Sequence, residues 1–149
     1  MKKIYLDTSV ISAYNDAREP EKAKQTRELL KKASPEAEIY ISTLVKEELS
    51  AIKNVERKKE LNALVSKYKS LVITDRVREL AEYYINNGLI PENHIEDALH
   101  LAIATIHEMD ILVSWNYTHL VKLKTRHLVN ALNLVSGYQE IEIILPIEY

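Results

Sequence analysis

Side chains that can bind metal ions or phosphate groups occur at four separated points of the chain. In chain order the candidates are Asp7, Thr8 and Ser9, then Glu47 and Glu48, then Asp97, and finally Asn116. If Asp7, Glu48 and Asp97 meet in the folded chain, their repulsion must be relieved. Two like charges about 4 Å apart cost about 4 kcal/mol at an effective dielectric constant near 20. A shared proton or a bound cation is the usual form of relief.

The available ligand atoms favour a hard cation. The chain has no cysteine, and its five histidines include no closely spaced pair. Oxygen ligands without thiolates suit Mg²⁺ or Mn²⁺ better than zinc. Such an ion polarises a phosphodiester and activates a water molecule for attack. These residue types therefore predict metal-assisted phosphoryl chemistry.

The elements that must position these residues alternate between short apolar strands and helices. Strands are expected at 3–6, 38–42, 71–73, 111–114 and 141–145. Helices are expected from Ser9, and at 20–33, 43–52, 55–68, 75–88, 94–108 and 118–136, with Asp75 as an N-cap and Gly88 as an end signal. This alternation is typical of crossover connections. We therefore expect an α/β fold with three α/β/α layers around a central, mostly parallel sheet.

In this fold the four points fall at one edge of the sheet. Asp7 follows the first strand, Glu48 lies in the helix after the second, and Asn116 lies just beyond the fourth. Asp97 lies in the first turn of a helix that is apolar on almost every side, which predicts a buried helix. Because ligand sites of such sheets form beyond the carboxyl ends of the strands, we expect one shared site.

Each point also has a plainer structural explanation. Asp7 is a suitable helix cap, adjacent glutamates are usually solvated, and Asn116 is a common turn residue. Asp97 gains from the helix dipole alone. We expect His100 to serve as a partner for a carboxylate or a backbone group, and His119 to have a capping or surface role. The shared edge, rather than any single residue, favours a functional site.

The totals describe an ordinary globular chain of 149 residues, with 46% hydrophobic and 28% charged residues. We expect one domain spanning 1–149, in the cytoplasm and without membrane contact. No apolar run approaches the roughly 18 residues of a membrane span, and Asp7 interrupts the start too early for a signal peptide. The formal charge of −2 excludes a generally basic coat. Two local basic clusters remain, most simply as solvated helix faces: Lys22, Lys24, Arg27, Lys31 and Lys32, and Lys53, Arg57, Lys58 and Lys59.

The ordered segments resemble the PIN-domain family, and most closely its VapC-type toxin branch. The resemblance rests on the strand-Asp-Thr-Ser opening, "ISTLVKEEL", "HIEDALHLAIA", "ILVSWNYTHL" and the closing "GYQEIEIILPIE". It implies a PIN-like α/β/α domain that acts as a Mg²⁺- or Mn²⁺-dependent endoribonuclease on RNA. It further implies a toxin–antitoxin role, with a protein antitoxin as partner, and a homodimer.

By position, the resemblance assigns the metal ligands and catalytic residues Asp7, Glu48 and Asp97. Glu48, rather than Glu47, matches because it stands six residues after Ser42. Thr8 and Ser9 are then supporting residues that bond to Asp7 or to a metal-bound water. Asn116 takes the fourth position, where many members have an aspartate. It keeps a carbonyl oxygen but removes one negative charge, which raises the question of whether a second metal ion binds.

Asp110 is not expected to replace that aspartate, because it precedes its strand and would lie at the opposite end. Two further functions stay open. A phosphohydrolase or phosphoacceptor would use Asp7 as a nucleophile, although a haloacid dehalogenase-like site would need an aspartate in place of Ser9. A PIN-fold module that binds RNA or protein without cleavage is favoured by Asn116, and the three carboxylates argue against it.

Overall fold

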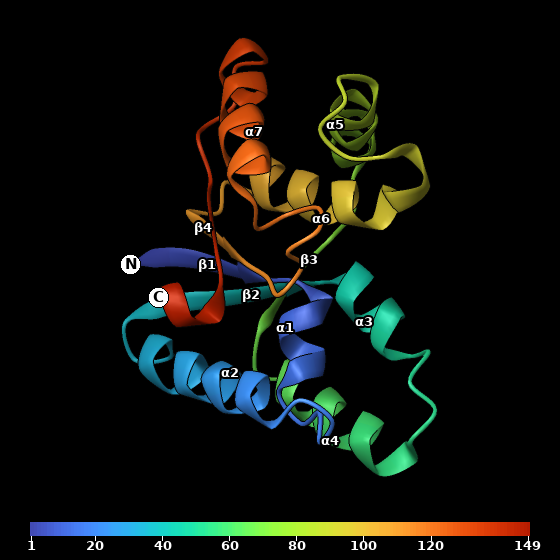
Figure 1. Cartoon of the computed structure of the whole chain (residues 1–149), viewed down its shortest axis with the longest axis vertical. Helices are drawn as coiled ribbons and strands as arrows, with labels where there is room; N and C mark the ends of the chain where they lie inside the picture. The colour runs from blue at the N-terminus through green and yellow to red at the C-terminus, as the bar shows by residue number, and fades with distance from the viewer.

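The computed structural model describes all residues, 1–149, as a five-stranded sheet covered by helices on both faces (Figure 1). The strands are β1 Lys2–Leu6, β2 Ala37–Ser42, β3 Lys69–Leu71, β4 Ile111–Val113 and β5 Glu142–Ile144. The helices are α1 Thr8–Ala13, α2 Pro20–Ala33, α3 Thr43–Leu49, α4 Val55–Val65, α5 Asp75–Asn86, α6 Ile95–Ile106 and α7 Leu123–Val135. Two short 3-10 helices are η1 Glu92–His94 and η2 Pro146–Glu148.

All four strand pairings are parallel, and the strand order is β3-β2-β1-β4-β5. Figure 1 shows α1, α2 and α4 on one side of the sheet and α5, α6 and α7 on the other. The expected three-layer α/β/α fold is therefore confirmed, with a sheet that is parallel throughout. No helix combines the length and the apolar character that a membrane span requires.

Polar caps end the neighbouring strands β1 and β2 and start the helices that follow them. The Asp7 carboxylate accepts a hydrogen bond from the Val10 amide at the start of α1, and the Ser42 hydroxyl accepts one from the Val45 amide at the start of α3. Each cap satisfies an amide that has no partner within its helix. The same local chemistry thus directs the chain away from the sheet at neighbouring strand ends.

Helix α6 lies in the core, as its apolar sequence predicts. Ala98, Leu101 and Ile103 are fully buried, and α6 packs against α5. A helix held this way can move little without opening the core, because protein interiors are close-packed. The polar residues on its first two turns therefore have fixed positions.

Several sequence-based boundaries are wrong, since the helices expected at 43–52 and 55–68 end at Leu49 and Val65, and three others have a visible cause. β3 ends at Leu71 rather than Ile73, because its partner β2 stops at Ser42 where α3 begins. The N-cap of α5 is Thr74, whose hydroxyl accepts the Val77 amide, and not Asp75. The last helix starts only at Leu123, because residues 116–121 form a turn.

Candidate active site

Asp7 is a buried carboxylate with several hydrogen-bond donors. It is 3% exposed, its Oδ1 accepts bonds from the Ser9 hydroxyl (2.6 Å) and the Val10 amide (3.2 Å), and its Oδ2 accepts one from the Ser114 hydroxyl (2.5 Å). Burial raises the pKa of Asp7 above its ordinary value, because these donors and His100 only partly offset the lost hydration. The ionised Asp7 carboxylate is therefore held in place, but its negative charge is only partly stabilised.

Ser114 ties this carboxylate to the adjacent strand. The pairing of Leu6 with Val113 sets Asp7 beside Ser114, where β1 and β4 end together. The Ser114 hydroxyl also accepts the Asn116 amide at 2.9 Å, and the Ser9 hydroxyl accepts the Trp115 amide at 2.9 Å. The loop after β4 is thus fixed to the residues around Asp7.

Glu48 turns inward from α3, while Glu47 on the same helix is exposed. Its Oε1 accepts the Thr8 hydroxyl at 2.7 Å and lies 2.7 Å from the His100 Nε2. Burial alone would raise the pKa of Glu48, but the His100 ring and the Thr8 hydroxyl outweigh it and hold the pKa below its ordinary value. Thr8 therefore supports Glu48, whereas Ser9 supports Asp7.

His100 connects α6 to the two central strands. Its Nδ1 lies 2.7 Å from the Tyr5 hydroxyl, which in turn lies 2.7 Å from the Ser42 hydroxyl. All three side chains are buried. The expectation that His100 serves as a partner for a carboxylate is confirmed by its contact with Glu48.

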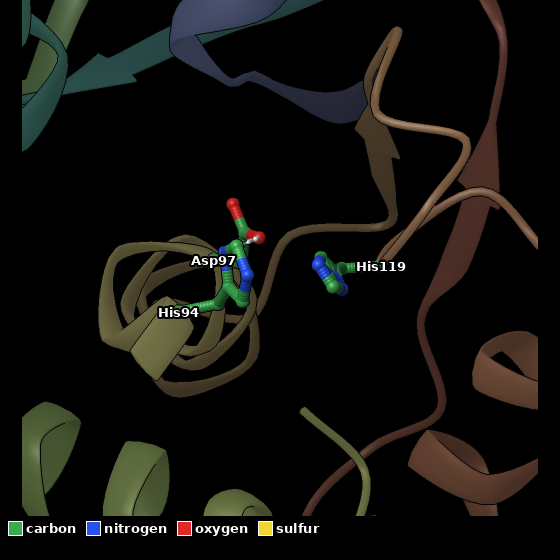
Figure 2. Close-up of side chains that lie close together, drawn as sticks. All are labelled: His94, Asp97 and His119. Atoms are coloured by element: carbon green, nitrogen blue, oxygen red, sulfur yellow. Dashed lines mark ion pairs between the residues drawn. The ribbon is translucent and has the colours of Figure 1, made fainter. Parts of the chain in front are cut away.

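Asp97 lies one turn before His100, on the same face of α6 because residues three apart are neighbours on a helix. It is half-buried, and its Oδ2 lies 3.8 Å from the Nδ1 of His94. Figure 2 shows His119 facing this pair from the loop after β4. The rings of His94 and His119 have their centroids 4.0 Å apart. The chain has no closely spaced pair of histidines in its sequence, but the fold brings together two that lie far apart in the chain.

The three predicted acidic ligands do not gather in one tight cluster. His94, Asp97 and His119 form the one group of three potential ligands in which all ligand atoms lie within 4.8 Å of one another. Asp7 instead faces two serines, and Glu48 faces Thr8 and His100. In place of a shared proton, hydrogen-bond donors stabilise each of these two carboxylates separately.

Asn116 acts as a turn residue in this structure. Its Oδ1 accepts the His119 amide at 3.0 Å, and its backbone carbonyl accepts the amides of Leu120 and Val121. A carbonyl oxygen has a second lone pair, so this contact still leaves one acceptor position. Asp110 lies at the opposite end of the sheet, as expected, since its carboxylate accepts the Lys3 amide at 2.8 Å.

The donor set at this edge of the sheet fits a hard divalent cation. The Glu48 Oε2 takes part in no hydrogen bond, and each Asp7 oxygen accepts bonds from neutral groups alone. Carboxylate and hydroxyl oxygens are the ligands that Mg²⁺ prefers. The raised pKa of Asp7 shows that its negative charge is poorly stabilised, and a bound cation would stabilise it.

His94, Tyr5 and Ser114 are residues at this edge to which the sequence analysis gave no role. The spacing of three between His94 and Asp97 on a helix start was an available signal for the first pair. No local signal marks the proximity of His119 or the bond between Tyr5 and His100. Both depend on how α6 packs against the sheet.

The sequence model of the PIN domain matches residues 4–119 of this chain. The chain belongs to the PIN-domain family. The matched segment includes Asp7, Glu48, Asp97 and Asn116, together with the strands and helices that carry them. PIN domains are typically metal-dependent nucleases, and they usually use divalent metal ions. Among curated proteins, none matches this PIN domain in sequence.

Solved structures with a similar fold come from bacterial toxin–antitoxin systems. VapC20 of Mycobacterium tuberculosis, a toxin that cleaves the sarcin-ricin loop, is 18% identical, with a TM-score of 0.61 over 78% of this chain and 92% of that chain. VapBC2 of Rickettsia felis, bound to a promoter DNA fragment, is 19% identical, with a TM-score of 0.58 over 96% of this chain and 98% of that chain. FitAcB of Neisseria gonorrhoeae is 16% identical, with a TM-score of 0.61 over 98% of this chain and 99% of that chain. At such identities the likeness establishes the fold.

Proposed function

We propose that this PIN-domain protein is a metal-dependent endoribonuclease that hydrolyses RNA phosphodiester bonds, with residues 1–149 as a single nuclease domain. The observation that carries the proposal is the ordered network at the sheet edge. Thr8 and His100 both contact Glu48, while Ser9 and Ser114 hold Asp7 at the end of β1. A buried carboxylate with a raised pKa is a frequent mark of a functional site.

The proposed ligands of one Mg²⁺ or Mn²⁺ ion are Asp7, Glu48 and Asp97. Their carboxylates lie apart in the ion-free chain and would have to close around the ion. Asn116 would complete the catalytic set. When bound, such an ion polarises the phosphodiester and lowers the pKa of a water molecule. Ser9 and Ser114 keep the Asp7 carboxylate in one orientation, and Thr8 does the same for Glu48. Fixing ligand orientation in this way reduces the reorganisation needed when substrate binds.

RNA contacts are expected at the loop after β4. Tyr117 is 51% exposed, and the Lys22 ammonium lies 5.7 Å from its ring and 5.6 Å from that of Trp115. An exposed aromatic ring beside a cation suits a stacked base and its phosphate. The basic cluster around Arg57 is less suited to RNA binding. Arg57 already donates hydrogen bonds to Ser12 and Asn15 and so joins α4 to the α1 region.

A toxin role with a protein antitoxin and a homodimeric state is part of this proposal. It is supported by the similarity of the fold to chains from VapBC complexes and from a Klebsiella pneumoniae toxin–antitoxin complex. Large apolar side chains are exposed at the end of α7, where Leu134 and Val135 are 62% and 82% exposed. Such exposed apolar surface is available for burial in an interface.

A second candidate is a PIN-fold module that binds RNA or protein without cleaving it. Asn116 favours it, because an amide at the fourth position already engaged in a turn lowers the negative charge at the site. The two functions differ in one property that can be measured, namely whether RNA is cut.

The test is cleavage of a mixed RNA pool in Mg²⁺ by the wild type, Asp97→Asn and Glu96→Gln. Asp97→Asn is expected to lower the cleavage rate at least about tenfold, since even the loss of an outer-shell partner of a metal ligand costs roughly 10- to 100-fold. Glu96 is exposed and adjacent, so Glu96→Gln should cut like the wild type. Equal cleavage by all three proteins would exclude Asp97 from the site, and no cleavage by the wild type would favour the binding module.

A further inference from the structure

His94, Asp97 and His119 form a compact group of potential metal ligands at the start of α6 (Figure 2). Their ligand atoms all lie within 4.8 Å of one another. Ligands bound at about 2.0–2.2 Å from one ion lie no more than about 4 Å apart. Small rotations of these half-buried side chains therefore suffice to close the group around an ion.

The backbone that carries His119 is held on both sides. Its amide donates to the Asn116 side chain at 3.0 Å, and its carbonyl accepts the Thr125 hydroxyl at 3.0 Å. His94 is the N-cap residue of the largely buried helix α6, and Asp97 lies in the first turn of that helix. The three ligands thus come from two rigidly positioned segments, as a preorganised site requires.

One atom in this group lacks a hydrogen-bond partner. The Nδ1 of His119 is buried and makes no hydrogen bond. A buried polar atom without a partner costs free energy, so natural proteins rarely retain one without a reason. A metal ion is a natural partner for an unprotonated imidazole nitrogen.

We propose that His94, Asp97 and His119 bind a first-row transition-metal ion such as Zn²⁺ or Co²⁺, at a site that uses neither the Asp7 nor the Glu48 carboxylate. Two imidazole nitrogens and one carboxylate oxygen suit such ions better than Mg²⁺. Three protein ligands also leave a coordination position open to solvent or substrate. Asp97 would be common to this site and to the proposed nuclease site. The binding itself does not depend on RNA cleavage.

The test is titration of the metal-free, full-length protein with Zn²⁺ by calorimetry and with Co²⁺ by visible absorption. We expect one tight equivalent in the presence of excess Mg²⁺. His94→Ala and His119→Ala should each weaken Zn²⁺ binding by about tenfold or more. His127 is exposed on α7, so His127→Ala is the matched control and should bind like the wild type.

Asp7→Asn separates this site from the proposed nuclease site, and it should keep the wild-type affinity for Zn²⁺. Because the His94 side chain is 44% exposed, His94→Ala is expected to fold even if His119→Ala does not. Wild-type Zn²⁺ affinity in folded His94→Ala would overturn the proposal. Loss of binding in Asp7→Asn together with its retention in His94→Ala would also overturn it, because the ion would then lie at the acidic residues.

Discussion

Asp7→Asn is expected to lower metal-dependent RNA cleavage by at least about 100-fold, the upper range for disturbing the surroundings of a metal ligand. Asn keeps one oxygen for the Val10 amide and Ser9, and its amide can donate to the Ser114 hydroxyl instead of accepting from it. The network therefore survives, and the loss isolates the charge of Asp7. The measurement is the cleavage rate of a labelled RNA in Mg²⁺.

The same substitution should leave the protein at least as stable at neutral pH. Burial raises the pKa of Asp7, so its ionisation begins to cost stability as the pH rises above the ordinary carboxyl value, and the cost is complete above the raised pKa. Below the ordinary carboxyl value Asp7 is protonated in both the folded and unfolded states, and the cost vanishes. The free energy of unfolding in urea should thus exceed the wild-type value in Asp7→Asn at neutral pH, and this difference should shrink as the pH falls.

A clear drop in the stability of Asp7→Asn at neutral pH would contradict this interpretation of the carboxylate. Added Mg²⁺ offers a control, because it should raise the melting temperature of the wild type more than that of Asp7→Asn. Ligand binding to the folded state stabilises by mass action, and the variant lacks a charged ligand.

Glu48→Gln is expected to reduce cleavage by about 10- to 100-fold, with Glu47→Gln as its matched control. Glu48 contacts Thr8 and His100, whereas Glu47 is exposed on the same helix. Glu47→Gln should therefore cleave at the wild-type rate. A comparable loss in both variants would indicate a general effect of charge on RNA binding and would remove Glu48 from the site.

Glu48→Gln should also differ from Asp7→Asn in the sign of its effect on stability. The His100 ring and the Thr8 hydroxyl hold the pKa of Glu48 below its ordinary value, despite its burial. Its ionised form therefore contributes stability that is present above the ordinary value and lost as the pH falls through the lowered pKa. Glu48→Gln should be less stable than the wild type at neutral pH, with the difference fading in acid.

The sequence predicted the α/β fold and the sheet edge because strand patterns and polar caps are local signals. Asp7 and Ser42 cap helices directly after apolar strands, and both features can be recognised in a few residues. Boundaries that depend on a neighbour were missed. β3 ends where its partner β2 ends, and the residues around Ile73 carry no information about where β2 ends.

The contacts among the candidate site residues were not predicted from the sequence. Family resemblance selected Glu48, yet its partner His100 is 52 residues away, and its position follows from the packing of α6. The close approach of His94 and His119 has the same origin. Sequence reasoning anticipated Ser9 beside Asp7 and a carboxylate partner for His100, but it did not anticipate that Thr8 and His100 would both contact Glu48.

The most direct test of the proposed metal-dependent nuclease is the rate of RNA cleavage by the wild type as Mg²⁺ is withdrawn and restored. We predict that cleavage stops under full chelation, returns when Mg²⁺ is added, and does not return in Asp7→Asn. Cleavage that persists without any divalent ion would contradict the carboxylate–metal mechanism.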